Sequence, residues 1–234
     1  MSKLSLILAE SSLELVPKEI QNHPSVLSHC KKLSKTASRI LLDNSWHYTA
    51  MKGIENEMKR GRPDLVHFSM LEACSIPLYF EKKISVYIHT LNDKVIKVGE
   101  DIHLPKSYHR FAGLIEKLFY EKRIESEGNI LLEMTDMSFP ELIETINPKN
   151  VVGLSSMGKP SSYTQVGKSL NEDSCIVIGG FQKGHFSDST KNKIDDLVSI
   201  DSDSLESHVV TARILYEYEK TILCKQKNLQ PMRP

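Results

Sequence analysis

The segment from Cys175 to Gly184 shows most clearly how this chain could bind a ligand. It reads Cys-Ile-Val-Ile-Gly-Gly-Phe-Gln-Lys-Gly, so an apolar run ends directly at a pair of glycines. Such a run is typical of a buried parallel strand, and glycine lets the backbone turn sharply and approach a ligand closely. A second run, Leu197–Ile200, is followed by Ser202 and Ser204. The pattern predicts a small-molecule site late in the chain, and a tight turn without a ligand is the alternative.

Residues 153–160 nearly spell a phosphate-binding loop. Gly153, Gly158 and Lys159 fit the spacing G-x-x-x-x-G-K, and a predicted strand precedes them. The next residue is Pro160, which lacks the hydroxyl group that binds magnesium in such loops. We therefore expect an exposed strand end whose backbone lines a pocket for a neutral ligand. A nucleotide hydrolase is the alternative.

Positive side chains gather at the starts of two predicted helices. The two groups are Lys59, Arg60 and Arg62, and His103, Lys106, His109 and Arg110. The helix macrodipole disfavours cations at this end, so the placement suits a surface to which phosphates bind. An ordinary solvated face is the alternative.

Asp43, His47 and Asp64 form a third set that could do acid–base chemistry. Asp43 follows a predicted strand, and His47 lies one helical turn further on. Each of these residue types is also common as a helix cap or a satisfied surface group. The sequence holds no His-x-x-x-His pattern and no nucleophile elbow, so we expect neither a zinc site nor a Ser/His/Asp triad.

The composition excludes several classes of protein. The 234 residues include 30 Lys and Arg against 30 Asp and Glu, so any surface for nucleic acid must be local. The four cysteines are scattered, which favours reduced thiols over a disulfide framework. No apolar run approaches the roughly 20 residues of a membrane span. We expect a soluble cytoplasmic protein that has no membrane partner and binds no metal.

The hydrophobic pattern predicts an alternation of strands and helices, and hence an α/β fold with a mostly parallel sheet flanked by helices. Strands are expected at 4–9, 39–42, 84–90, 94–98, 150–154, 174–178 and 197–200. Helices are expected at 11–20, 46–58, 62–73, 107–123, 139–146, 163–170 and 205–223.

The pattern also predicts how the chain is organised. Residues 1–224 are expected to form one domain, with a β-hairpin inserted at about 76–104 because residues 91–93 carry a hairpin signal. Residues 121–128 are charged and are predicted to form a linker or mobile loop. Residues 225–234 are expected to form a polar tail.

Five ordered segments resemble one family, the small-subunit ribosomal RNA pseudouridine N1-methyltransferases of the trefoil-knotted SPOUT class. The resemblance runs from Leu6 to about Leu223. The segments are LILAESSLELVP at 6–17, GRPDLVH at 61–67, VYIHT at 86–90, LPKSYHRFAGL at 104–114 and IGGF at 178–181.

The resemblance implies a C-terminal trefoil knot that binds S-adenosylmethionine, and a homodimer packed partly through the last helix. It implies methylation of N1 of a pseudouridine in small-subunit ribosomal RNA and a role in small-subunit biogenesis. The implied cofactor-binding residues are Leu154, Ser155, Gly158, Gly179, Gly180, Phe181, Gly184, Ser199, Ile200, Asp201, Ser202, Ser204 and Leu205.

The implied RNA contacts are Arg62, held by Asp64, and the three positions His103, Lys106 and Arg110. The family usually has arginine at all three of these positions. Lys106 keeps the charge without the bidentate fork, and an unperturbed histidine is mostly neutral at pH 7. Weaker RNA binding is therefore expected.

Proton removal from the target nitrogen calls for a base. Asp43 and Asp64 are the candidate catalytic carboxylates, although Asp64 is also expected to orient Arg62. A ribosome-assembly factor that binds RNA with little or no methyl transfer is the alternative function.

Overall fold

The centre of the molecule is β1 (Leu4–Ser11), in which every residue is buried. In the computed structural model, which describes residues 3–227, this strand pairs in parallel with β2 (Ile84–Thr90) on one side and β7 (Ser174–Gly179) on the other. A strand covered on both faces has no polar side to show water, which explains its unbroken apolar run. Residues 228–234 of the expected polar tail lie outside the described residues.

The sheet has eight strands in the order β4-β5-β3-β2-β1-β7-β6-β8. The remaining strands are β3 (Lys94–Val98), β4 (Arg123–Ser126), β5 (Asn129–Asp136), β6 (Asn150–Pro160) and β8 (Asp196–Ser199). Strands β2, β1, β7, β6 and β8 run in parallel, whereas β3, β5 and β4 are antiparallel. The expected α/β fold with a mostly parallel sheet is confirmed. The carboxyl ends of the parallel strands meet along one edge, where α/β proteins usually bind ligands.

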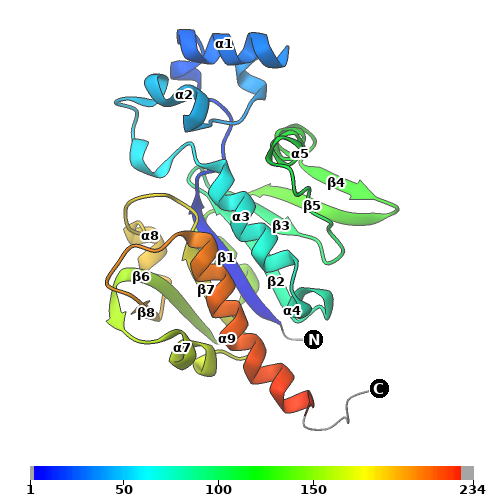
Figure 1. Cartoon of the computed structure of the whole chain (residues 1–234), viewed down its shortest axis with the longest axis vertical. Helices are drawn as coiled ribbons and strands as arrows, with labels where there is room; N and C mark the ends of the chain where they lie inside the picture. Colours follow the sequence, from blue (N-terminus) through cyan, green and yellow to red (C-terminus); the bar gives the residue numbers. More distant parts are fainter. Residues whose placement is uncertain (1–2, 228–234) are drawn as a thin grey trace.

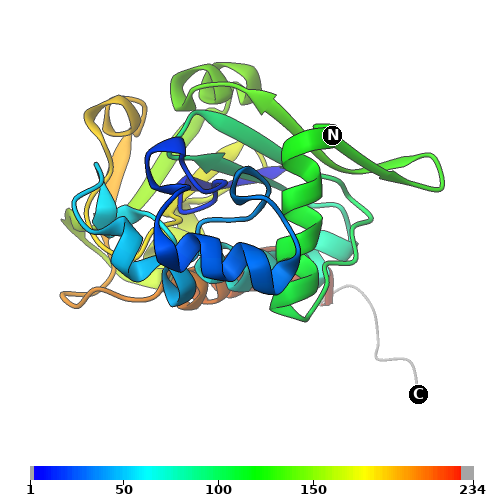
Figure 2. The ribbon, with the colours of Figure 1, turned by 90° about the horizontal axis from the view of Figure 1, so that it is seen from above.

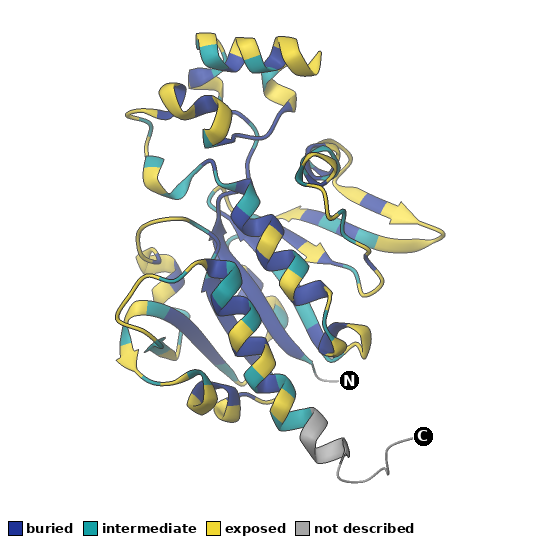
Figure 3. Ribbon diagram, in the orientation of Figure 1, coloured by how far each residue is buried: buried dark blue, intermediate teal, exposed yellow. Residues whose placement is uncertain are grey.

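Helices cover both faces of the sheet (Figures 1 and 2). Their bounds are α3 (Pro63–Cys74), α4 (Pro77–Phe80), α5 (Tyr108–Glu121), α6 (Phe139–Ile146), α7 (Tyr163–Ser169), α8 (Asp188–Lys191) and α9 (Ser207–Lys227). Successive residues of β1 point to opposite faces of the sheet and belong to two separate hydrophobic cores. Leu6 belongs to the core that includes residues of α3, α5 and α9, and Ile7 to the core that includes residues of α6. Figure 3 shows the buried stripe that α3 and α9 turn toward the sheet. No described helix is both long and apolar enough to cross a membrane.

Residues 13–60 form an insert above the carboxyl end of β1 (Figure 1). It contains α1 (Pro24–Leu33), α2 (Asn44–Met51) and three short 3-10 helices, at Lys18–Ile20, Ala37–Arg39 and Glu57–Lys59. Its small core includes Val26, Ile40 and Leu42. The guanidinium of Arg60 donates two hydrogen bonds of 2.7 Å to the carboxylate of Glu14, and both side chains are largely buried. This ion pair closes the insert onto the end of β1.

The predicted helix at 11–20 is wrong. The chain bends at Ser12, Leu15 pairs with Leu41 in an isolated bridge, and the first α-helix begins only at Pro24. Pro17 has an extended backbone before the short 3-10 turn. The apolar residues of this stretch pack against the sheet and the insert, so their spacing does not report a helix face. The strand predicted at 39–42 is reduced to the same single bridge.

Residues 121–128 are not a linker or mobile loop. They contain β4, which pairs with β5 through a hairpin turn at Glu127 and Gly128, both with positive φ. Only Ile124 of β4 is buried, because the strand lies at the edge of the sheet and its other side chains reach water.

The helix predicted at 46–58 is shorter in the structure, since α2 ends at Met51 before Gly53.

The other predicted elements agree with the structure within a few residues. Strand β6 is the main exception, because it continues to Pro160 with a register shift against β8. The strands of the predicted hairpin, β2 and β3, are antiparallel neighbours, and β2 also joins the central sheet through β1.

We predict that Arg60→Met lowers the free energy of unfolding by about 3–5 kcal/mol, because it leaves the Glu14 carboxylate buried without a counter-charge. Urea unfolding monitored by circular dichroism measures the change. The double variant Glu14→Gln/Arg60→Met should recover part of the loss. Lys193→Met is the control, since it breaks an exposed ion pair with Glu144 and should change stability by less than about 1 kcal/mol. If Lys193→Met and Arg60→Met changed the free energy of unfolding equally, the special role of the buried Arg60–Glu14 pair would be contradicted.

Candidate functional site

A pocket opens at the carboxyl edge of the sheet, between the ends of β6 and β7 and the segment that leads from β8 into α9. It encloses about 690 Å³ including its open mouth. Leu154, Ile178, Leu205 and Val210 supply apolar walls, and glycine-containing backbone supplies exposed peptide groups. Such a lining suits a ligand with an apolar ring and several hydrogen-bonding atoms.

Most of the predicted cofactor residues line this pocket. They are Leu154, Ser155, Gly179, Phe181, Gly184, Ile200, Asp201, Ser204 and Leu205. The structure therefore brings together three chain segments that the sequence separates widely.

Four predicted residues do not line the pocket. A side chain at Gly158 would lie 2.4 Å from the backbone of Val198, so this glycine allows β6 and β8 to approach each other. A side chain at Gly180 would lie 2.1 Å from the hydroxyl of Ser11. The Ser199 hydroxyl donates to the carbonyl of Asp201, and Ser202 is exposed outside the lining.

Three further lining residues, Ser156, Gln182 and Asp203, lie within the segments 154–158, 179–184 and 199–205 that the family resemblance implies. Sequence reasoning missed five others: Ile178, His185, Phe186, Ser207 and Val210. Ile178 was signalled as the last residue of the apolar run. The Ser207 hydroxyl donates a 2.5 Å hydrogen bond to the carbonyl of Gly179, which ties the start of α9 to the end of β7. No local pattern predicts a bond across that distance in sequence.

The near phosphate-binding loop is strand. Residues 153–160 belong to β6, and Lys159 and Pro160 pair with β8. The structure therefore lacks, in this segment, the loop that would wrap a phosphate before a helix.

The expected cationic group at 59–62 is largely used inside the protein. Lys59 donates to the Glu10 carboxylate at 2.5 Å, and Arg60 is paired with Glu14. Arg62 donates two 2.8 Å hydrogen bonds to Asp64 and remains partly exposed. Of this group, Arg62 alone pairs with a carboxylate that is itself partly exposed, Asp64.

Arg62 lies close to the pocket. The hydrogen bonds that Arg62 donates to Asp64 raise the pKa of the Arg62 guanidinium, and the negative charge of Glu206 adds to this effect. Glu206 immediately precedes α9 and follows the lining residue Leu205. The guanidinium at the start of α3 therefore lies within electrostatic reach of the segment that leads into α9.

Asp43 is a buried structural carboxylate in this arrangement. It caps α2 by accepting from the Ser45 N–H at 2.8 Å, and it accepts from the Tyr108 hydroxyl at 2.5 Å. Burial and this bond to Asp43 raise the pKa of Tyr108. The contact joins the insert to the start of α5.

The start of α5 presents the other predicted cations to solvent. His103, Lys106 and Arg110 are all exposed. Among the described side chains, neither Lys106 nor Arg110 has an acidic ion-pair partner. His67 of α3 contacts the Pro105 carbonyl at 2.7 Å, so the starts of α3 and α5 are fixed together. Unpaired cations on one rigid surface can bind an anionic polymer.

A histidine pair lies beneath the insert. His47 accepts from the Asp43 N–H at Nδ1, and its Nε2 lies 3.0 Å from Nδ1 of His29. His29 stacks on Trp46 with the ring centroids 4.5 Å apart. Burial first, and then the neighbouring His29, lower the pKa of His47 to about 4, so His47 is neutral at pH 7.

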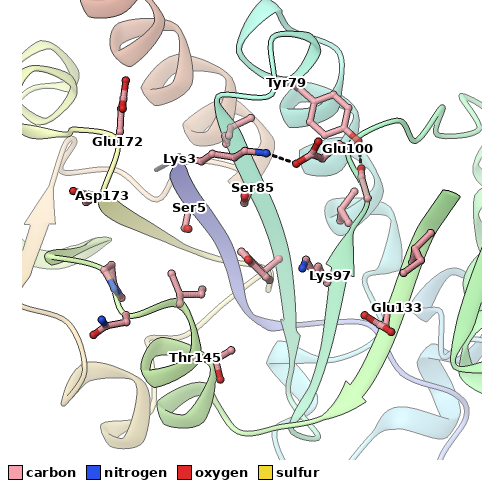
Figure 4. Close-up of a pocket in the computed structure, with 18 residues that line it drawn as sticks. Lys3, Ser5, Tyr79, Ser85, Lys97, Glu100, Glu133, Thr145, Glu172 and Asp173 are labelled. Carbon is pink, nitrogen blue, oxygen red and sulfur yellow. Dashed lines mark hydrogen bonds and ion pairs between the residues drawn. The ribbon is translucent and has the colours of Figure 1, made fainter. Parts of the chain in front are cut away.

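A second hollow lies at the opposite, amino ends of the parallel strands (Figure 4). It is larger than the first pocket, with about 1460 Å³ including its open mouth. Lys3 is paired there with Glu100, and the Tyr79 hydroxyl donates to Gly99 and accepts from Ile102. This hollow lies away from the predicted site residues, none of which lines it.

Metal and thiol chemistry find no support in the described residues. They contain no group of three His, Cys, Asp or Glu side chains that could hold a metal ion. Cys30, Cys74 and Cys175 are free and buried, and burial raises the pKa of Cys74 to about 12. A thiol in that state is a poor nucleophile.

Comparison with known proteins identifies the family. The model of the family described as EMG1/NEP1 methyltransferase matches residues 6–219. The chain belongs to the EMG1/NEP1 methyltransferase family. It is 38% identical to the ribosomal RNA small subunit methyltransferase Nep1 of Thermococcus sibiricus, over 94% of this chain and 99% of that one.

A solved EMG1/NEP1 structure is also similar. The crystal structure of Archaeoglobus fulgidus Nep1 bound to S-adenosylhomocysteine is 36% identical, with a TM-score of 0.84, and the match covers 94% of this chain and 98% of that one. The family resemblance and the fold class expected from the sequence are thereby confirmed. The individual site residues and the knot stay predictions.

We predict that the stability of this EMG1/NEP1 family member falls as the pH is lowered from about 6.5 to about 4. Unfolded His47 takes up a proton near its ordinary pKa of 6.5, whereas folded His47 does so only near 4. The contribution of His47 to the free energy of unfolding is thus complete above pH 6.5. It falls by about 3 kcal/mol in total as the pH is lowered to about 4.

Urea unfolding at several pH values measures this loss. His47→Gln should decline less steeply over the same interval, and His109→Gln, at an exposed position, should follow the unaltered protein. Parallel curves for all three proteins would contradict the assignment to His47.

Proposed function

We propose that this chain is an S-adenosylmethionine-dependent methyltransferase that acts on N1 of a pseudouridine in small-subunit ribosomal RNA. The observation that carries the proposal is the pocket of exposed, uncharged backbone at the ends of β6, β7 and β8. The names of the family relatives and the S-adenosylhomocysteine bound to the Archaeoglobus protein support it. A role in small-subunit biogenesis follows from such a substrate.

The pocket residues fit this cofactor. Apolar side chains such as Leu154 and Leu205 can cover an adenine ring, while the backbone of the 179–184 segment offers hydrogen bonds. Asp201 and Asp203 lie on the rim, where their carboxylates suit a ligand that carries ammonium and sulfonium charges. The cofactor supplies a methyl group on a positively charged sulfur. Gly158 and Gly180 would act indirectly, by letting strands and loop approach each other.

We propose that the RNA surface comprises Arg62, Asp64, His103, Lys106 and Arg110. Asp64 holds the Arg62 guanidinium in a fixed plane, which prepares it for bidentate contact with a phosphate. Lys106 and Arg110 offer exposed charges from α5, and phosphate contacts of this kind dominate RNA affinity. His103 and Lys106 supply less of this interaction than arginines would.

The main catalytic task proposed for the chain is positioning. Holding the target nitrogen in line with the methyl group can supply about 7–11 kcal/mol of the barrier reduction. The target base must leave its stack to reach the pocket, which a loop in the RNA makes easier. Asp43 and Asp64 remain the candidates to assist proton loss, although both carboxylates already accept hydrogen bonds within the protein.

We also propose a homodimer, a trefoil knot and a cytoplasmic location. Tyr216 of α9 and Phe68 of α3 are large apolar residues that are 61% and 44% exposed, and a second copy could cover them. The knot rests on the family resemblance. The location is supported by the archaeal sources of the relatives.

An RNA-binding assembly factor with little methyl transfer is the second candidate. It is favoured by His103 and Lys106, which replace arginines usual in the family and can weaken the hold on the substrate. Such a factor need not bind the cofactor, so cofactor binding distinguishes the two.

We expect the purified protein to bind S-adenosylhomocysteine with a heat measurable by calorimetry, and to transfer labelled methyl to a small-subunit ribosomal RNA fragment that contains the pseudouridine. Mass spectrometry of nuclease digests locates the label. A matched fragment with uridine at that position is the control, because N1 of uridine is bonded to the sugar and cannot accept the methyl group. Binding of both cofactor and RNA without transfer would favour the assembly factor; no cofactor binding would exclude the methyltransferase.

We expect Arg110→Gln and Arg62→Gln each to weaken RNA binding and to flatten its dependence on salt. Each lost phosphate contact should reduce the slope of log K against log salt by about 0.7–0.9. Filter binding between about 50 and 300 mM salt measures the slope of log K for RNA binding against log salt concentration. Lys117→Gln, further along α5 and paired with Glu121, is the matched control. Unchanged slopes in both arginine variants would remove them from the interface.

A further inference from the structure

Lys59 lies behind the loop that forms one wall of the cofactor pocket. Its ammonium group donates 2.5 Å hydrogen bonds to the His185 carbonyl and to the Glu10 carboxylate, and it lies 4.5 Å from the centre of the Phe181 ring. A side chain at Gly184 would lie 3.0 Å from Cε of Lys59. Phe181, Gly184 and His185 all line the pocket. One lysine thus lies against three residues of this loop, Phe181, Gly184 and His185.

Glu10 completes the support from the end of β1. Its second carboxylate oxygen accepts from the Ser187 N–H at 2.7 Å, just beyond the loop. Burial alone would raise the pKa of Glu10, but the bonds from Lys59 and Ser187 outweigh it and the pKa lies below its ordinary value. Glu10 also has φ of 50°, in the left-handed region that is unusual for a residue other than glycine. The surrounding contacts therefore hold this carboxylate in a fixed place.

A short, well-fixed stretch of backbone joins Lys59 to Arg62. The Ser12 hydroxyl donates to the Lys59 carbonyl, and the Gly61 carbonyl accepts from the Asn44 N–H at 2.9 Å. Gly61 has φ of 70°, and a side chain there would lie 2.6 Å from Met51. Arg60, between them, is anchored by Glu14. Little room remains for the two ends of this stretch to move independently.

We propose that Lys59 is a positioning residue that couples the cofactor pocket to the RNA surface. A ligand that contacts the 181–185 loop acts on Lys59 through His185 and Phe181, and Lys59 in turn acts on the stretch that carries Arg62 and Asp64. By linkage, RNA bound at Arg62 must favour the cofactor by the same factor as the cofactor favours RNA. The inference rests on the proposed function, since it names how the two ligands of that site assist each other.

The test compares RNA affinity with and without saturating S-adenosylhomocysteine. We expect the unaltered protein to bind RNA at least about fivefold more tightly in its presence, within the usual range of coupling between sites. Lys59→Met should weaken S-adenosylhomocysteine about tenfold and reduce the coupling to less than about twofold. Lys59→Arg keeps a donor and a charge over Phe181. It should restore most of the S-adenosylhomocysteine affinity and most of the coupling.

Matched variants separate coupling from folding. Lys52→Met, an exposed lysine of the insert, should leave both quantities unchanged. Glu10→Gln keeps Lys59 but removes its counter-charge. Like Lys59→Met, it should therefore reduce the coupling between the two ligands. Each variant is assayed below its measured melting temperature. If Lys59→Met and Glu10→Gln both failed to fold, the pair would belong to the fold alone and the proposal would be overturned.

Two further results would overturn it. One is a Lys59→Met protein with a lowered melting temperature but unaltered cofactor affinity and coupling. The other is an unaltered protein that binds both ligands independently, which would leave the proposed function intact. An unaltered protein that does not bind S-adenosylhomocysteine would remove the proposed function itself.

Discussion

Two buried carboxylates determine how this molecule is assembled. Glu10, near the end of the central strand β1, and Glu14, just beyond it, are only 4% and 5% exposed, so each requires a cation inside the protein. Lys59 and Arg60 provide the two charges, and both come from the far end of the insert. The chain must therefore leave β1, form the insert and return to nearly the same place. That return places Arg62 and Asp64 at the start of α3, two to five residues beyond the two buried cations.

The insert is fixed at a second place by a different kind of contact. Asp43 receives the Tyr108 hydroxyl, and Glu116 of α5 accepts from the Leu41 N–H at 3.1 Å. The helix α5 is thereby held beside the starts of α2 and α3. The exposed cations of the proposed RNA surface then come from two helices whose relative position is set by buried polar contacts, and the insert has the architectural role of holding them.

The sequence sufficed for features that depend on local patterns. Apolar runs located β1, β2, β7 and β8, and the 3.6-residue period located α5. It failed at residues 11–20, where buried side chains serve two cores and imitate the spacing of a helix. It failed again at β4, whose charged residues indicate only that an edge strand faces water.

The candidate site divides in the same way. Glycine-rich strand ends marked the pocket, and the family resemblance supplied the loop before α9. The use of Lys59 and Arg60 was not predictable, because their partners Glu10 and Glu14 lie more than 40 residues earlier. A run of cations in the sequence cannot say which members face inward. Only the tertiary contacts separate Arg62 from its neighbours.

The stacking of Trp46 on His29 gives the molecule an optical marker. Trp46 is the single tryptophan of the chain, and it is 40% exposed on the insert with the Lys32 ammonium 4.3 Å from its ring centre. Indole emission from this protein therefore originates entirely in the insert, and the sheet contributes none. Fluorescence thus reports the local state of the segment that carries Lys59 and Arg60, separately from the remainder of the fold.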